Sequence, residues 1–155
     1  LFDFLTSLHG DGSDDLIASL GDGRQLPEGP AVDMQTAEED TQALRDQIAH
    51  IVSVWERDGL CVPEEVLILH SRSDLAGSAI GQTDKLGGYP LIGHHESGKG
   101  IRHCSIHKAK GLDSKAVILV GVTTPSNEEM GSYDRFTLFM GASRARQILA
   151  VLTST

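Results

Sequence analysis

The sequence predicts an α/β domain with a mainly parallel sheet and helices on both faces. Runs of Val, Ile and Leu at 66–70, 116–122 and 148–152 are typical of strands that are buried on both sides. Segments whose apolar residues recur at helical spacing separate these runs, as in a layered α/β fold. The chain has 155 residues, of which 39% are hydrophobic and 23% charged, so its composition suits one globular domain.

The N-terminal segment differs from the rest of the chain. Residues 1–30 are rich in Gly, Asp and Pro, which predicts loops and one short helix at 14–20 that Ser13 would cap. The folded domain is therefore expected over 31–155. It would open with a short strand at 31–35.

The clearest predicted helix follows that strand. Thr36 offers a capping oxygen, and Glu39 three residues later completes a capping box. Apolar side chains then recur on one helix face as far as Trp55, and Gly59 ends the helix. The buried strand at 66–70 comes next.

The second half of the chain alternates between helical and extended patterns. The run AVILVGV at 116–122 is the strongest strand, and we expect it to be buried on both faces. The elements expected around it are a helix at 74–86, strands at 89–92 and 101–106, a helix at 134–146 and a last strand at 148–152.

Charge is distributed unevenly along the chain, whose net charge is −9. Residues 1–65 hold 15 acidic and three basic residues, whereas residues 66–155 hold seven acidic and ten basic ones. The second half contains a basic window made of Lys99, Arg102, Lys108, Lys110 and Lys115, with His103 and His107 between them. This window is either a solvated basic face or a local site for phosphate, in a nucleotide or in a nucleic-acid backbone.

Other features of the sequence bear on where the protein works. Two cysteines, Cys61 and Cys104, cannot form a disulfide framework, which favours a reduced, cytoplasmic setting. No run approaches the ~18 apolar residues of a membrane span, and we expect no membrane partner. The first residues, LFDFLTSLHG, lack the basic start of a signal peptide. Because the sequence does not begin with Met, we expect a fragment or a processed form.

A glycine-rich segment at 93–100 imitates a phosphate-binding loop. The sequence GHHESGKG fits the pattern G-x-x-x-x-G-K but ends in Gly instead of the Ser or Thr that holds magnesium. The residues that follow alternate like a strand, whereas a phosphate-binding loop must open a helix. We therefore expect a glycine-rich turn here.

A histidine-rich group raises zinc binding as an alternative. His94, His95, His103, Cys104 and His107 fall within 14 residues, and all are residue types that bind zinc. Their spacing matches no standard zinc finger, and His103 and Cys104 would point to opposite faces of a strand. We expect ordinary surface and core roles for these side chains and assign no metal site.

The segment IHKAKGLDSKAVILVG at 106–121 offers groups that suit phosphate and sugar hydroxyls. A turn bearing His107, Lys108, Lys110, Gly111 and Asp113 precedes a strong buried strand. In open α/β sheets, ligands bind at the loops outside the strand ends. The glycine would let backbone approach a ligand closely, and the neighbouring leucine would anchor the loop in the core.

The segment LFMGASRA at 138–145 places Arg144 among small residues on a predicted helix. Small neighbours leave the guanidinium free to project, and its planar fork suits a phosphate group. Arg146 is expected on the same helix, about 200° away from Arg144.

Together these two segments resemble the superfamily 1 helicases of the UvrD/Rep type. The first is similar to their fifth motif, H-x-x-K-G-L-E followed by a hydrophobic strand, and the second to their sixth, approximately Y-V-A-x-T-R-A followed by a strand. Asp113 replaces the usual Glu, Ser143 the usual Thr, and Phe139 stands where Tyr is frequent. The likeness covers roughly 31–153 and implies a second RecA-like domain, with neither the first, ATP-binding domain nor an accessory insertion.

The resemblance also implies roles for individual residues. Arg144 would be the catalytic arginine that reaches the γ-phosphate of ATP across an interdomain cleft. Lys110, Gly111 and Asp113 would meet the nucleotide, the acid at the ribose. His107 and Lys108 would face single-stranded DNA, although the sequence does not separate the ATP and DNA roles of His107 and Lys110.

These roles define the expected activity. ATP and Mg²⁺ would be held mainly by the N-terminal RecA-like domain, which is the expected partner of this one. The chain alone should not hydrolyse ATP and should bind single-stranded DNA weakly. The alternatives are a non-motor interaction module, a degenerate ATPase domain of a nuclease or regulatory protein, or a zinc-dependent protein.

Overall fold

The computed structural model describes residues 30–71, 79–122 and 132–154, and these form one twisted sheet covered by helices. Seven strands in this part of the chain lie in the order β1-β7-β6-β2-β5-β4-β3, and all neighbours are parallel except β3 and β4. The strands are β1 (Asp33–Thr36), β2 (Val66–His70), β3 (Lys85–Leu86), β4 (Tyr89–Gly93), β5 (Ile101–Ser105), β6 (Ser114–Val122) and β7 (Ala145–Thr153).

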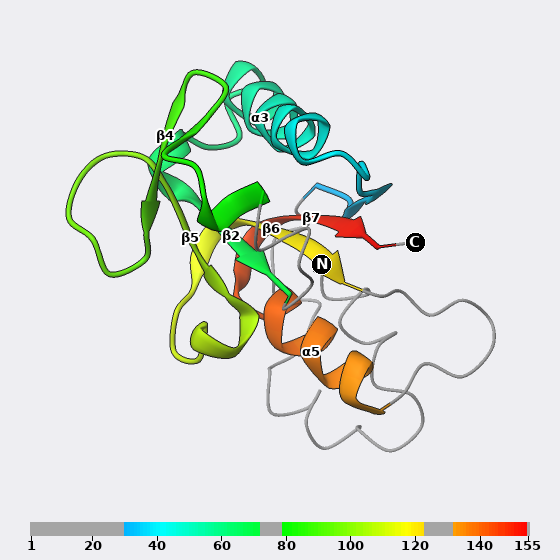
Figure 1. The fold of residues 1–155 in the computed structure, drawn as a ribbon. Coiled ribbons are helices and arrows are strands. Elements are labelled where there is room, and N and C mark those ends of the chain that lie inside the picture. Colours follow the sequence, from blue (N-terminus) through cyan, green and yellow to red (C-terminus); the bar gives the residue numbers. More distant parts are fainter. Residues whose placement is uncertain (1–29, 72–78, 123–131, 155) are drawn as a thin grey trace.

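In the described part of the chain, two α-helices cover opposite faces of the sheet (Figure 1). They are α3 (Thr41–Arg57) and α5 (Ser132–Ala142), and two 3₁₀ turns, η3 (Pro63–Glu65) and η4 (Ile106–Lys108), flank strands of the sheet. The predicted mainly parallel sheet with helices on both faces is confirmed. No helix in the described ranges is both long enough and apolar enough to cross a membrane.

Strict alternation along three central strands sorts the apolar side chains between the two faces. Ile68, Ile118 and Ala150 stand in register on neighbouring strands and belong to the cluster under α3. The residues one position earlier on each strand, Leu67, Val117 and Leu149, belong to the cluster under α5. The prediction that 116–122 is buried on both faces is confirmed.

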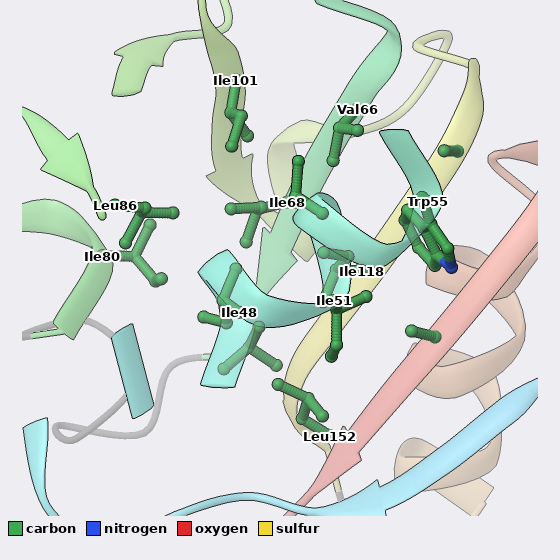
Figure 2. Packing of buried hydrophobic residues seen from close by; sticks show 14 of the residues in the cluster. Ile48, Ile51, Trp55, Val66, Ile68, Ile80, Leu86, Ile101, Ile118 and Leu152 are labelled. Atoms are coloured by element: carbon green, nitrogen blue, oxygen red, sulfur yellow. The ribbon is translucent and has the colours of Figure 1, made fainter. Parts of the chain in front are cut away.

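Helix α3 covers its face with one apolar stripe (Figure 2). Leu44, Ile48, Ile51, Val52 and Trp55 are its buried residues, and their spacing is the helical period that the sequence predicts. Figure 2 shows the side chains of Ile48, Ile51 and Trp55 among those of the strands, with Val66 and Ile68 of β2, Ile118 of β6 and Leu152 of β7 around them.

Helix α5 lies closer to the sheet because a glycine faces β6. Leu138 and Ala142 are fully buried against the second cluster, together with Ile106 from η4. A Cβ atom at Gly141 would lie 2.5 Å from Cδ2 of Leu119, whose side chain is completely buried. The missing side chain therefore sets how closely the C-terminal end of α5 approaches the sheet.

The start of α3 differs from the prediction. Thr36 is the last residue of β1, and the N-cap is Asp40, whose carboxylate accepts a hydrogen bond from the Ala43 N–H at 2.9 Å. Asp and Thr are both good caps, so the sequence offers two starts, and pairing of Thr36 with Thr153 on β7 selects the later one. The predicted end is confirmed, because Gly59 follows the helix with φ +71°.

Other predicted boundaries also move. Of the predicted 74–86 helix, the structure describes residues 79–86. Residues 79–81 are helical, whereas Lys85–Leu86 forms β3, which is antiparallel to β4. Helix α5 ends at Ala142, and β7 begins at Ala145 instead of at 148. The predicted helix at 14–20 and the start of the 74–86 helix lie outside the described residues.

Gly141→Ala should destabilise the domain by ~1–3 kcal/mol, because an added methyl group must displace either Leu119 or the helix. Chemical denaturation of the purified chain, followed by circular dichroism, measures this change in the free energy of unfolding.

Gly81→Ala is the matched control. Gly81 is also helical and exposed, and no atom lies within 4 Å of the position of an added Cβ. Alanine should therefore leave stability unchanged or raise it by up to ~1 kcal/mol. Equal losses in the two variants would contradict the close approach of α5 to β6.

Candidate functional site

The two segments that carry the sequence signals meet at the amino ends of β6 and β7. The Ser114 N–H donates a hydrogen bond of 2.9 Å to the carbonyl oxygen of Arg144. Asp113 directly precedes Ser114, and Nε of Arg146, two residues after Arg144, lies 3.9 Å from Oδ2 of Asp113. The fold thus brings the segments that hold Arg144 and Asp113 side by side, although they are far apart in the sequence, and the side chain that contacts Asp113 is that of Arg146.

The segment between β5 and β6 connects opposite ends of the sheet. Ser105, the last residue of β5, pairs with His70, the last residue of β2. Strand β6 begins at the other end of the sheet, two residues before Ala116, which pairs with Val66, the first residue of β2. The chain returns between these points across the α5 face, with Ile106 and Ala109 buried in the cluster there.

This path separates residues that the sequence groups in one turn. His107 and Lys108 belong to η4, at the carboxyl end of β5, and both are exposed. Asp113 directly precedes β6 at the amino end, and Gly111 lies two residues before it. The residues that the sequence analysis assigns to DNA, His107 and Lys108, therefore lie toward one end of the sheet, and Gly111 and Asp113 lie toward the other, with Lys110 between them along the chain.

Arg144 lies in the turn between α5 and β7, not on a helix as predicted. Its Nε donates to the Met140 carbonyl oxygen at 3.3 Å, and its Nη2 lies 3.4 Å from Oγ of Ser143. Ser143 Oγ also donates to the Met140 carbonyl, at 2.9 Å. Because the last carbonyls of a helix lack internal partners and carry partial negative charge, a half-buried guanidinium is stabilised here.

Glycine is required at position 111. Its φ is +82°, a value that residues with a side chain rarely adopt, and no atom lies within 4 Å of where a Cβ would stand. The turn is closed by a bond of 2.9 Å from the Leu112 N–H to the Ala109 carbonyl. Leu112 packs against the α5-face cluster and leaves Asp113 exposed, which confirms the predicted anchoring of this loop.

The basic window is not one continuous patch. The guanidinium of Arg102 donates hydrogen bonds to the carbonyl oxygens of Glu96 and Gly98, at 2.7 and 3.4 Å. Lys115 pairs with Glu65 at 3.7 Å, next to a bond from Ser114 Oγ to the Glu65 carbonyl. Of the five bases, Lys99, Lys108 and Lys110 are the exposed ones.

The glycine-rich segment 93–100 forms a turn that is closed on itself. The Gly93 N–H donates to the Glu96 carboxylate at 3.2 Å, and Arg102 holds two of the loop's carbonyls. The loop leads into β5 and opens no helix. The expectation of a plain glycine-rich turn is confirmed, and the amide groups that would cradle a phosphate have no helix behind them.

The histidine and cysteine side chains do not gather as one group. Cys104 faces the α5 cluster, whereas His103 is in register with Ile68 on the other face, as predicted for adjacent strand residues. Burial raises the pKa of Cys61 to about 11 and also raises that of Cys104, so both thiols stay protonated at neutral pH. No set of three or more His, Cys, Asp or Glu residues within the described ranges is arranged to hold a metal ion.

Two further residues of the site carry no recognisable signal in the sequence. Arg146, expected on the same helix as Arg144, lies on β7 beside Asp113. Glu65 anchors the start of β6 through Ser114 and Lys115. Both contacts arise from strand pairing between distant segments, which local patterns do not encode.

The fold is similar to that of a solved domain. A crystal structure described as the C-terminal domain of a possible DNA helicase from Lactobacillus plantarum WCFS1 is similar, with a TM-score of 0.59. The match covers 84% of this chain and 76% of that chain at 18% sequence identity, so it establishes a common fold. No protein-family model matches the sequence, and no curated protein matches it significantly.

Lys99→Ala should leave the affinity of the 155-residue chain for ATP unchanged, because the 93–100 loop is closed by its own contacts and opens no helix. Equilibrium binding titrations check this expectation. A loss of affinity of tenfold or more would mean that Lys99 contacts phosphate and that the loop is a phosphate site after all.

Proposed function

We propose that this chain is the second RecA-like domain of a DNA helicase or translocase of the UvrD/Rep type, and that it completes an interdomain ATP site. The observation that carries the proposal is the junction at the amino ends of β6 and β7. There, the hydrogen bond from the Ser114 N–H to the Arg144 carbonyl joins the segment that resembles the fifth motif to the segment that resembles the sixth, and Asp113 pairs with Arg146 beside it. The fold shared with a possible helicase domain supports the same proposal.

In this proposal Arg144 acts on the phosphates of ATP. Its side chain rests on the Met140 carbonyl and on Ser143, and its Nη1 has no hydrogen-bond partner within the described residues. Turning the fork toward the γ-phosphate would exchange two long hydrogen bonds for charge-assisted ones. A guanidinium at that place stabilises the charge that spreads over the transferring oxygens.

Asp113 and Gly111 serve the rest of the nucleotide. The exposed carboxylate of Asp113 can accept hydrogen bonds from ribose hydroxyls once it leaves Arg146, and a pair so exposed is weak. The open space beside Gly111 admits a ligand close to the backbone. Mg²⁺ would be held mainly by the partner domain, as the resemblance to the helicases implies.

The opposite end of the sheet is proposed to meet single-stranded DNA. His107 and Lys108 are exposed there, at the carboxyl end of β5. Binding by this chain alone should be weak, because the net charge of −9 opposes a polyanion. Hydrolysis of ATP at the amino ends of β6 and β7 would then be coupled to DNA binding at the carboxyl end of β5 through the segment between β5 and β6.

One observation favours a second candidate, a non-motor interaction module. The guanidinium of Arg144 already has a structural task, which is to satisfy a carbonyl at the end of α5. In a module without ATPase activity, this capping role would be the whole role of the residue.

Arg144→Ala should lower the ATP turnover of the full-length protein by at least ~10²–10³-fold, the cost of one preorganised donor at a developing charge. Its free energy of unfolding should fall by only ~1 kcal/mol, because one helix-end hydrogen bond is lost. Steady-state phosphate release and chemical denaturation measure the two effects separately.

The matched variants for this test are Arg144→Lys and Arg135→Ala. Lysine keeps the charge but lacks the planar fork, so it should restore turnover poorly. Arg135 is exposed near the other end of α5, so Arg135→Ala should leave ATP turnover unchanged. Unchanged turnover in Arg144→Ala would rule out the helicase site and leave the interaction module.

Lys108→Ala should weaken binding of single-stranded DNA to this chain and reduce the slope of log affinity against log salt by about 1. Fluorescence anisotropy titrations at several salt concentrations give that slope. Lys85→Ala, an equally exposed lysine on β3, is the control and should change neither quantity. Equal effects of the two substitutions would show that binding is not located at η4.

A further inference from the structure

Two histidines from neighbouring strands face each other at the carboxyl ends of β2 and β5. His103 is in register with Ile68, two residues before His70, so both imidazoles lie on the α3 face of the sheet. Their ring centroids are 6.2 Å apart, and the ring planes are inclined by 36°. The sequence gives no sign of this pair, because the two residues are far apart along the chain.

The hydrogen bond of His70 determines which of its nitrogens is available. Its Nδ1 lies 3.1 Å from the carbonyl oxygen of Ser71. A carbonyl oxygen only accepts, so Nδ1 is the donor, and in the neutral ring Nε2 keeps its lone pair. Histidines that bind metal ions commonly have this arrangement, with one nitrogen held by a carbonyl and the other left for the ion.

His103 contributes a buried nitrogen that lacks a partner. Its Nδ1 is inaccessible to solvent and makes no hydrogen bond within the described part of the chain. A buried polar atom of this kind is costly unless a ligand or a water satisfies it.

The spacing of the two rings fits one bound ion. A zinc ion bound at ~2.1 Å from a ring nitrogen lies about 3.2 Å from the ring centroid, so two rings that share an ion have centroids at most about 6.5 Å apart, a limit reached when the two nitrogens lie on opposite sides of the ion. The observed 6.2 Å lies inside that limit. Imidazole nitrogen is a preferred ligand of Zn²⁺, Cu²⁺ and Ni²⁺ and not of Mg²⁺ or Ca²⁺.

We propose that His70 and His103 form a two-imidazole site for a divalent transition metal such as Zn²⁺, with water in the remaining coordination positions. This pair differs from the histidine-rich group expected from the sequence, because it includes His70 and leaves out Cys104, which faces the other side of the sheet. The proposal does not depend on the proposed helicase function.

Zn²⁺ titration by calorimetry, with the 155-residue chain, tests the site. His70→Gln and His103→Gln should each weaken Zn²⁺ binding by more than the ~10–100-fold that loss of an outer-shell partner costs. His50→Gln on the exposed side of α3 is the control and should bind as the unmodified chain does. Lowering the pH from 7 to 5.5 should weaken binding, because both imidazoles must be unprotonated.

Histidine ring resonances in the NMR spectrum of the unmodified chain locate the ion without any substitution. Zn²⁺ should shift the ring signals of His70 and His103. Unchanged Zn²⁺ affinity in the two glutamine variants would overturn the proposal. Shifts confined to His94 and His95, whose rings lie 5.2 Å apart on the neighbouring loop, would also overturn it and place the ion there.

Discussion

The structure depends on the burial of β6. From Ala116 to Val120 every side chain of this strand is completely buried, so both of its faces must be covered and both of its edges paired. Strands β2 and β7 pair with the edges, α3 covers one face, and α5 with η4 covers the other. Burial of apolar surface at roughly 25 cal/mol per Å² makes this layered packing the main favourable term of the fold.

The same burial positions the candidate site. Gly141 lets the end of α5 approach β6, and two residues later the chain turns into β7 alongside the start of β6. The backbone of Arg144 has little freedom in this short turn, because its carbonyl oxygen accepts a hydrogen bond from the Ser114 N–H. A core contact thereby determines where a charged side chain meets solvent.

Some of this arrangement could be predicted from the sequence and some could not. The buried strands at 66–70 and 116–122 stand out because their apolar runs are continuous, and the stripe of α3 stands out because its period is helical. The end of α5 was misplaced because the sequence from Arg144 onward remains compatible with a helix, and only pairing with β6 makes it a strand. The contact between Arg146 and Asp113 and the pair of His70 with His103 arise from register between distant segments, which no local pattern contains.

The connection between β5 and β6 has a mechanical consequence. From the level of Ser105 down to Ser114 the sheet is about 20 Å tall, at ~3.3 Å per strand residue. The chain between them makes two hydrogen-bonded turns, from Ile106 to Ala109 and from Ala109 to Leu112, and a turn of this kind spans less than ~7 Å. The two turns must therefore follow one another along the sheet to cover that height, which leaves this connection little spare length.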